Sequence, residues 1–302
     1  MKENYRFIST IKTKLVTRIQ NFQKRSKIIG VYLSLADFFN LLDEFFYFKS
    51  LLRLTVKDSL DGLEILSIVD NRDELFRAKR IFTKEPGTID WITNYFKKDD
   101  VFFDIGANIG VFSLFSAKKI ENLKVIAFEP LALNYSKLNE NIIINKLDKQ
   151  VIAYNISLND KETISNLFVN NFSGGASGSQ YNSNLDPYGK EFIPQFVQGS
   201  VGFSLDFFIQ KGNLPMPNHI KIDVDGNELL IIEGAKKTLD SPDLRTILIE
   251  LFTEDDDHDN SKCMEKISEG RQTVQLIESK GFLLKRMDKV GKNLNNYLFT
   301  RD

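Results

Sequence analysis

The chain has 302 residues, 42% of them hydrophobic and 27% charged, which is typical of a globular protein with a substantial core. Its 40 basic and 41 acidic residues nearly cancel, so no overall field would draw it to nucleic acid, and no nucleic-acid partner is expected. The single cysteine, Cys263, excludes a disulfide framework or a cysteine-based zinc site within one chain. No secretory signal or transmembrane segment is recognisable. We therefore expect a cytoplasmic protein, with peripheral membrane attachment left open.

Residues 1–50 are expected to form an N-terminal helical extension. Apolar side chains recur there at helical spacing, at Leu35, Phe38, Phe39 and Leu42. The favoured interpretation is a helix that packs its apolar face on the main body. A membrane surface, or a homo-oligomer formed through these helices, is left open.

Residues 51–98 are expected to lead into the core through a hairpin and two helices. Apolar segments at Leu51–Val56 and Leu63–Val69 flank a good turn dipeptide, Asp61-Gly62. Two helical patterns follow at Arg72–Phe82 and Thr88–Phe96, where Thr88 is read as a helix cap.

Residues 99–302 alternate between apolar strands and helices, which is typical of a parallel sheet covered on both faces. The expected strands are Val101–Asp104, Lys124–Phe128, Val151–Asn155, Ile220–Asp223 and Thr246–Leu251. The expected helices between them are Val111–Lys119, Leu133–Asn145 and Glu228–Leu239.

Two final strands, Phe282–Met287 and Asn296–Thr300, are expected to close the sheet as an antiparallel hairpin. The fold class is therefore α/β and Rossmann-like, with a seven-stranded, mostly parallel sheet. That arrangement differs from the six-stranded parallel order of dinucleotide dehydrogenases.

A polar insert at Val169–Val201 interrupts the alternation and contains the Gly/Ser-rich segment Ser173–Ser179. A long insert at this level of a sheet is often a functional loop or lid. A mobile excursion without function is the equally weighted alternative.

The segment Asp104–Gly110 is a candidate cofactor-binding turn. It follows a buried strand and runs into a helix, and ligands of open α/β sheets bind outside the carboxyl ends of the strands. Gly106 and Gly110 allow a tight turn and close approach to a ligand, and Asp104 is placed to take an amino group. Glu129 ends the next strand, where a carboxylate commonly grips two ribose hydroxyls.

A dinucleotide site is the competing interpretation of this turn. Its fingerprint needs a second glycine two residues after the first, where this chain carries Asn108. The substitution counts against NAD or FAD, and not against a ligand without phosphates at the helix.

Several motifs in this order resemble the FkbM family of S-adenosylmethionine methyltransferases over about residues 80–300. The motifs that carry the resemblance are Glu85-Pro86, Phe103 to Gly110, Phe128-Glu129-Pro130, Ser204-Leu205-Asp206, His219 to Glu228, Glu233-Gly234-Ala235 and Asn296 to Phe299.

The resemblance implies a class I methyltransferase fold, S-adenosyl-L-methionine as cofactor, and O-methylation of sugars or secondary metabolites. It implies that Asn155 to Ser157 lie near the adenine and that the Glu85 segment folds over the cofactor's amino-acid end. One departure is Asp225, where many relatives carry Glu, which puts a direct catalytic role for that side chain in doubt. The cofactor-binding residues that we expect are Glu85, Asp104, Gly106, Asn108, Gly110, Glu129, Pro130 and Ser157.

Asp223, Lys221 and Glu250 are the candidate catalytic residues. Methyl transfer needs an oxygen held against the methyl group, and a hydroxyl also benefits from a base. Asp223 lies at the mouth of its strand, and Lys221 shares its face and is expected to pair with it and keep it ionised. Glu250 is expected near Asp223 if the two strands are neighbours, whereas His219 is expected to be a packed histidine.

A divalent-cation site formed by these carboxylates and residues 254–259 is a minor alternative, because such acidic runs are more often solvated loops. We therefore expect no metal. The leading hypothesis is an O-methyltransferase with a small-molecule or glycan acceptor. The alternative is a catalytically idle Rossmann-like module that uses the cofactor site for regulation or assembly.

Overall fold

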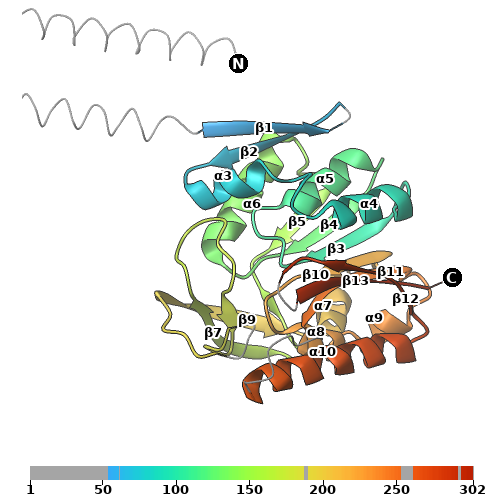
Figure 1. The fold of residues 1–302 in the computed structure, drawn as a ribbon. Coiled ribbons are helices and arrows are strands. Elements are labelled where there is room, and N and C mark those ends of the chain that lie inside the picture. The colour runs from blue at the N-terminus through green and yellow to red at the C-terminus, as the bar shows by residue number, and fades with distance from the viewer. Residues whose placement is uncertain (1–53, 61, 187–189, 253–260, 292–293, 302) are drawn as a thin grey trace, which may run out of the picture. The chain divides into compact units, whose positions relative to one another are not determined.

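A twisted seven-stranded sheet forms the centre of the computed structural model, which describes residues 54–60, 62–186, 190–252, 261–291 and 294–301 (Figure 1). The strand order is β12-β13-β11-β10-β3-β4-β5. Neighbours from β11 to β5 run parallel, while β13 is antiparallel to both β11 and β12. The predicted α/β class with an antiparallel closing pair is confirmed. The strands are β3 (Val101–Ile105), β4 (Lys124–Phe128), β5 (Val151–Tyr154), β10 (His219–Ile222), β11 (Thr246–Phe252), β12 (Leu283–Lys289) and β13 (Leu294–Thr300).

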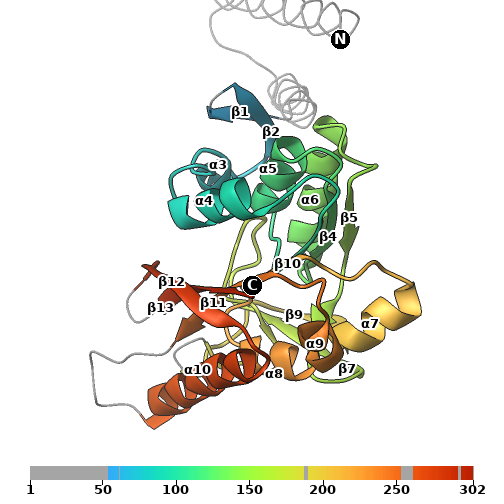
Figure 2. The ribbon, with the colours of Figure 1, turned by 90° about the vertical axis from the view of Figure 1, so that its right-hand side faces the viewer.

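Helices cover both faces of this sheet, because its strands are apolar on both sides. Successive residues of one strand enter different cores. Phe102 packs with one helix layer and Phe103 with the other. Figures 1 and 2 show α4, α5 and α6 on one face and α7 to α10 on the other. The helices are α4 (Pro86–Tyr95), α5 (Val111–Lys119), α6 (Ala132–Ile144), α7 (Leu205–Gly212), α8 (Glu228–Glu233), α9 (Lys236–Asp240) and α10 (Ser261–Ser279).

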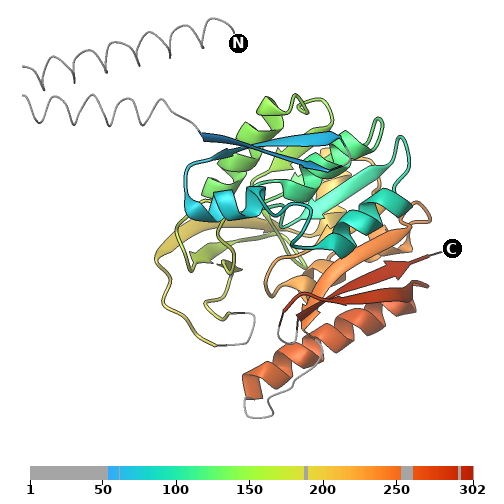
Figure 3. The ribbon, with the colours of Figure 1, turned by 45° about the horizontal axis from the view of Figure 1, so that its top comes forward.

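The predicted hairpin is present as β1 (Leu54–Leu60) and β2 (Leu63–Val69), which pair antiparallel and lie over the helices of one face (Figure 3). Helix α3 (Arg72–Ala78) is shorter than predicted, because the chain continues after it in tighter turns. Thr88 lies inside α4 and caps nothing by itself; its Oγ1 donates to the carboxylate of Glu85, the residue at the helix start. The reading of Thr88 as the cap was therefore wrong.

The polar insert and the residues just before it form a second sheet that the sequence did not predict. Its strand order is β6-β9-β7-β8, with β7 and β9 pairing antiparallel over their length. These strands expose apolar side chains, Ile164 and Val201 among them, and so lack the clear inside–outside alternation on which prediction depends. The strands are β6 (Ser157–Leu158), β7 (Thr163–Val169), β8 (Gln180–Tyr181) and β9 (Phe196–Phe203).

The single helix predicted for 228–239 is two helices, α8 and α9, with a break at Gly234. A side chain at Gly234 would overlap the carbonyl oxygen of Asn159. The carboxylate of Asp206 accepts hydrogen bonds from the backbone N–H groups of Lys237 (2.7 Å) and Thr238 (2.9 Å), and so caps α9 from a distant element.

The predicted N-terminal extension, residues 1–50, lies outside the described residues. Across the described ranges, the helices are all too short or too polar to cross a membrane.

Candidate functional site

The carboxyl ends of β3, β4, β10 and β11 border a cavity of about 130 Å³, which we call the central cavity. Five residues that the sequence predicts at these strand ends line the cavity, namely Gly106, Asn108, Glu129, Asp223 and Glu250. Parallel strands end at one edge of a sheet, which is why residues separated by more than a hundred positions meet there.

Gly106 makes the turn after β3 with a φ of +84°, in the left-handed region that favours glycine. A Cβ atom here would overlap the carbonyl oxygen of Asp223, so the turn can lie against β10 only because the side chain is absent. The N–H groups of Gly106 and Ala107 donate to the Phe128 carbonyl at 2.9 and 3.0 Å. This turn is therefore fixed against both neighbouring strands.

Glu129 extends into the same cavity from the end of β4 and is 5% exposed. Its Oε2 accepts from the N–H of Asn108 at 2.8 Å, and its Oε1 accepts from the N–H of Leu131 at 2.9 Å. Burial raises the pKa of Glu129 to about 7, although these N–H groups favour the ionised form. Each oxygen retains acceptor capacity toward the cavity.

Two residues of the glycine turn lie away from the cavity lining. Asp104 is fully buried and accepts from the Ser113 hydroxyl at 2.5 Å. Burial raises the Asp104 pKa, opposed by the charge of Lys221. Gly110 starts α5 with a φ of +90°, and a Cβ atom there would overlap the Leu138 side chain.

Lys221 and Asp223 form the predicted ion pair, with Nζ and Oδ2 2.6 Å apart. Burial disfavours the charge on both, but each stabilises the other, so the pKa of Lys221 is raised and that of Asp223 is lowered. Asp223 is therefore an ionised carboxylate at neutral pH. Nearby Glu250 behaves in the opposite way, because burial and the charge of Asp223 raise its pKa to about 9.

Glu85 lies close to this charge cluster, although it comes from the segment before the sheet. It is 4% exposed and accepts from Lys84 Nζ and Thr88 Oγ1, both at 3.1 Å. Its charge also contributes to the raised pKa of Lys221. Lys84 itself lines the central cavity.

The segment Ser173–Ser179, which we call the strap, borders the central cavity with its last four residues. The Ala176 carbonyl accepts from the side-chain amides of Asn108 (2.8 Å) and Asn134 (3.1 Å). The Gly178 N–H donates to Asp225 Oδ2 at 2.7 Å. Asp225 thus holds the strap, and burial, with the charge of Asp223, raises its pKa.

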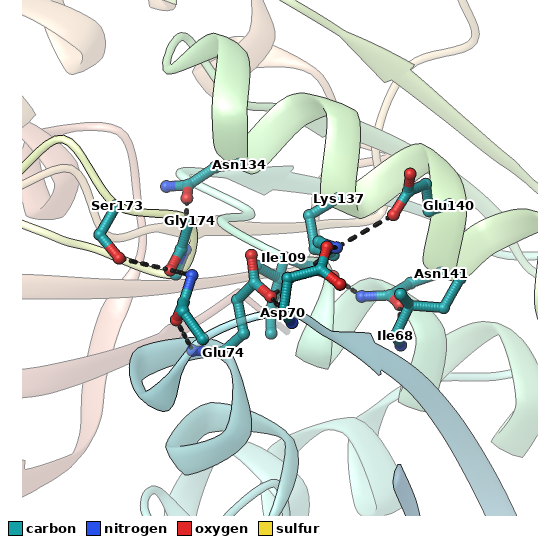
Figure 4. A network of polar contacts seen from close by, with 12 residues as sticks. Ile68, Asp70, Glu74, Ile109, Asn134, Lys137, Glu140, Asn141, Ser173 and Gly174 are labelled. Atoms are coloured by element: carbon teal, nitrogen blue, oxygen red, sulfur yellow. Dashed lines mark hydrogen bonds and ion pairs between the residues drawn. The ribbon is translucent and has the colours of Figure 1, made fainter. Parts of the chain in front are cut away.

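Further anchors of the strap come from α6, α3 and the residue before α3; Figure 4 shows Ser173 and Gly174 of the strap beside Asn134 of α6. The Gly174 carbonyl accepts from the side chain of Asn71 at 3.0 Å, and the Gly175 N–H donates to Asn134 Oδ1 at 2.8 Å. Arg77 Nε donates to the Gly175 carbonyl, and Arg77 also lines the central cavity. The sequence does not predict Arg77, Lys84 and Asn134 as site residues, because no local sequence pattern indicates that helices and a distant loop meet there.

A narrower cavity of about 40 Å³, which we call the apolar slot, adjoins the central cavity. Its walls are mostly apolar, with Phe128, Pro130 and Ile156 among them, and Ser157 lies here. The two cavities share Gly106, Pro130, Ser179 and Val224. The two cavities therefore adjoin each other at the strand ends.

His219 is a packed histidine, as predicted. It is fully buried at the opposite end of β10, and its ring nitrogens pair with Thr246 Oγ1 (2.7 Å) and Asp100 Oδ2 (3.0 Å). Residues 254–259, needed for the alternative cation site, lie outside the described residues. The described part of the chain contains no cluster of three side chains suited to a metal ion.

A mostly parallel sheet with this strand order, and a carboxylate-lined cavity at its carboxyl edge, define a Rossmann-like enzyme of the methyltransferase class. Residues 104–284 match the methyltransferase FkbM domain, and the chain belongs to that family.

Named relatives include the hexuronic acid methyltransferase AglP of Haloferax volcanii, 24% identical over 221 residues, or 72% of this chain and 83% of that protein. Methyltransferase sdnD of Sordaria araneosa is 26% identical over 152 residues, 44% of this chain and 59% of sdnD. Among solved structures, methyltransferase FkbM from Methylobacillus flagellatus is 14% identical with a TM-score of 0.44, covering 70% of this chain and 47% of that one.

S-adenosylmethionine is the cofactor of this family member, and the residues present suit it. Glu129 presents carboxylate oxygens that suit ribose hydroxyls, and the mostly apolar lining of the adjoining slot suits a flat heterocycle. Asn108 occupies the position where a pyrophosphate would need glycine.

Proposed function

We propose that this methyltransferase transfers a methyl group to a hydroxyl oxygen of a saccharide or secondary metabolite. The proposal rests mainly on two carboxyl groups that line the central cavity and differ in pKa: the pKa of Asp223 is lowered and that of Glu250 is raised. The relative named as a hexuronic acid methyltransferase is in keeping with a saccharide acceptor.

In this proposal, residues 99–302 form the cofactor-binding domain, and 51–98 adds Arg77, Lys84 and Glu85 to its site. The cofactor supplies a methyl group bound to a sulfonium, and the neutral thioether that remains is a good leaving group. Glu129 holds the ribose, and Pro130 and Ser157 border the adenine. Asp104 and Gly110 do not line the cavity. Asp104 acts on it through its electrostatic effect, and Gly110 shapes the turn at the start of α5.

Asp223 is the proposed base. Its carboxylate stays ionised because Lys221 lies 2.6 Å away, so Lys221 acts through Asp223 rather than on the acceptor. Glu250, with a pKa of about 9, is protonated at neutral pH and can donate a hydrogen bond to the acceptor oxygen or its neighbour. Because their pKa values differ, one carboxyl group can accept a proton while the other donates a hydrogen bond.

Arg77 and Lys84 favour an acceptor that carries a negative charge. Both cationic side chains line the cavity near Asp223 and contribute to lowering its pKa. Arginine in particular binds carboxylates through paired donors. A sugar acid would place its carboxylate against them and its hydroxyl toward Asp223.

The test is transfer of labelled methyl groups from S-adenosylmethionine to matched glycosides of glucose and glucuronic acid. We expect methylation of the glucuronoside, a loss of more than about a hundredfold in kcat for Asp223→Asn, and nearly unchanged cofactor binding in that variant. Arg77→Gln should raise KM for the glucuronoside with little change in kcat. If Asp223→Asn methylated the glucuronoside at the normal rate, Asp223 would not be the base. If the enzyme methylated both glycosides equally well, it would have no preference for a negatively charged acceptor.

A further inference from the structure

Ser179, the last residue of the strap, carries a buried hydroxyl without a partner. Within the described ranges, its Oγ atom makes no hydrogen bond to any other group. An unpaired buried hydroxyl lowers stability, because it gives up water and receives nothing in return. Such an atom calls for a partner that the protein alone does not provide.

The position of Ser179 indicates what that partner is. It belongs to the lining of both the central cavity and the apolar slot, where the two meet. In the proposed cofactor position, with the ribose at Glu129, the base would extend past Pro130 into the slot. The slot is apolar apart from a few groups, so a polar atom where the two cavities meet would face the edge of the base.

Hydrogen bonds to Asp225 hold both neighbours of Ser179, one through its backbone and one through its side chain. The preceding residue, Gly178, donates to Asp225 at 2.7 Å. The following residue, Gln180, is 4% exposed and donates through Nε2 to the Asp225 carbonyl at 2.5 Å. The hydroxyl can therefore reorient only by rotation about one bond, among three staggered positions.

We propose that the strap is part of the cofactor site and that the Ser179 hydroxyl forms a hydrogen bond with the purine ring of S-adenosylmethionine. The sheet β6-β9-β7-β8 then serves to deliver the strap to the slot. Asp225 is a positioning residue in this arrangement, since its carboxylate and its carbonyl hold both neighbours of Ser179.

The test compares Ser179→Ala with Ser173→Ala, a matched change in the same strap at a residue that borders neither cavity. Calorimetry with S-adenosylhomocysteine should give a dissociation constant roughly 3- to 10-fold higher for Ser179→Ala, the equivalent of one hydrogen bond. Ser173→Ala should bind as the unaltered protein does. Ser179→Ala should raise the dissociation constant by the same factor for 5′-methylthioadenosine, which keeps the base and ribose but lacks the amino-acid part.

Thermal unfolding of the empty proteins separates this role from a structural one. Ser179→Ala should unfold at the same temperature or higher, because it removes an unpaired hydroxyl. A lower unfolding temperature together with unchanged affinity would overturn the proposal. If Ser179→Ala lost affinity for S-adenosylhomocysteine but not for 5′-methylthioadenosine, the proposal would also be overturned, because the hydroxyl would then contact the amino-acid part of the cofactor.

Discussion

At the scale of single residues, the site depends on one glycine that lies against the neighbouring strand. Gly106 has a φ of +84° and no room for a Cβ beside the Asp223 carbonyl, whereas Gly281 has a φ of +83° and open space around it. Gly106→Ala should lower the free energy of unfolding by more than about 3 kcal/mol, and Gly281→Ala by about 1–2 kcal/mol. Urea unfolding of both variants measures the difference. Equal losses would mean that only backbone strain, and not the contact with β10, matters at Gly106.

The protonation of Glu129 should make cofactor binding depend on pH. Its pKa in the empty protein is raised to about 7, mainly by burial. Ribose hydroxyls donate best to the ionised carboxylate, so affinity should be full above pH 7 and should fall, by up to about tenfold per unit, as pH drops below it. Titrations with S-adenosylhomocysteine between pH 5.5 and 8.5 check this. Glu129→Gln should bind weakly and without this pH dependence; a flat profile for the unaltered protein would contradict the assignment.

At the scale of elements, a buried lysine joins the hairpin, α3 and α6 beside the strap. Lys137, 5% exposed, pairs with Asp70 at 2.5 Å and Glu140 at 3.0 Å and lies 3.7 Å from Glu74, itself 3% exposed (Figure 4). Lys137→Met removes the cation that faces the buried Glu74 carboxylate and should cost about 3 kcal/mol or more in unfolding free energy.

The exposed pair Lys98–Glu121 supplies the control for this substitution. Lys98→Met should cost less than about 1 kcal/mol, because solvent screens an exposed pair. The double variant Lys137→Met with Glu74→Gln should recover part of the lost stability. Failure to recover any would mean that the lysine stem, and not its charge, supports the packing.

The parallel strands could be predicted because both of their faces are buried, which leaves unbroken apolar runs such as Val101–Phe103. The second sheet could not, since β7 and β9 pair polar and exposed apolar side chains. The break between α8 and α9 escaped prediction for another reason. Its causes, Asn159 and Asp206, belong to other elements and leave no mark on the helical pattern itself.

At the scale of the whole molecule, the central cavity gathers residues from Arg77 to Glu250 at one edge of the sheet. Those that directly follow strands, such as Glu129 and Asp223, could be predicted, because topology alone places them there. The sequence could not reveal Arg77, Lys84 or Asn134, or that the strap borders this cavity, because these depend on how the hairpin segment and the insert fold back. It also could not foresee that Asp104 is covered by Ser113 and lies behind the cavity lining.

The central claim is that S-adenosylmethionine occupies the central cavity with its ribose on Glu129. Calorimetric titration of S-adenosylhomocysteine into the unaltered protein and into Glu129→Ala tests it most directly. We predict binding to the unaltered protein, a loss of roughly tenfold or more in affinity for Glu129→Ala, and no heat from NAD in either. Unchanged affinity in Glu129→Ala, or binding of NAD in place of S-adenosylhomocysteine, would contradict this account.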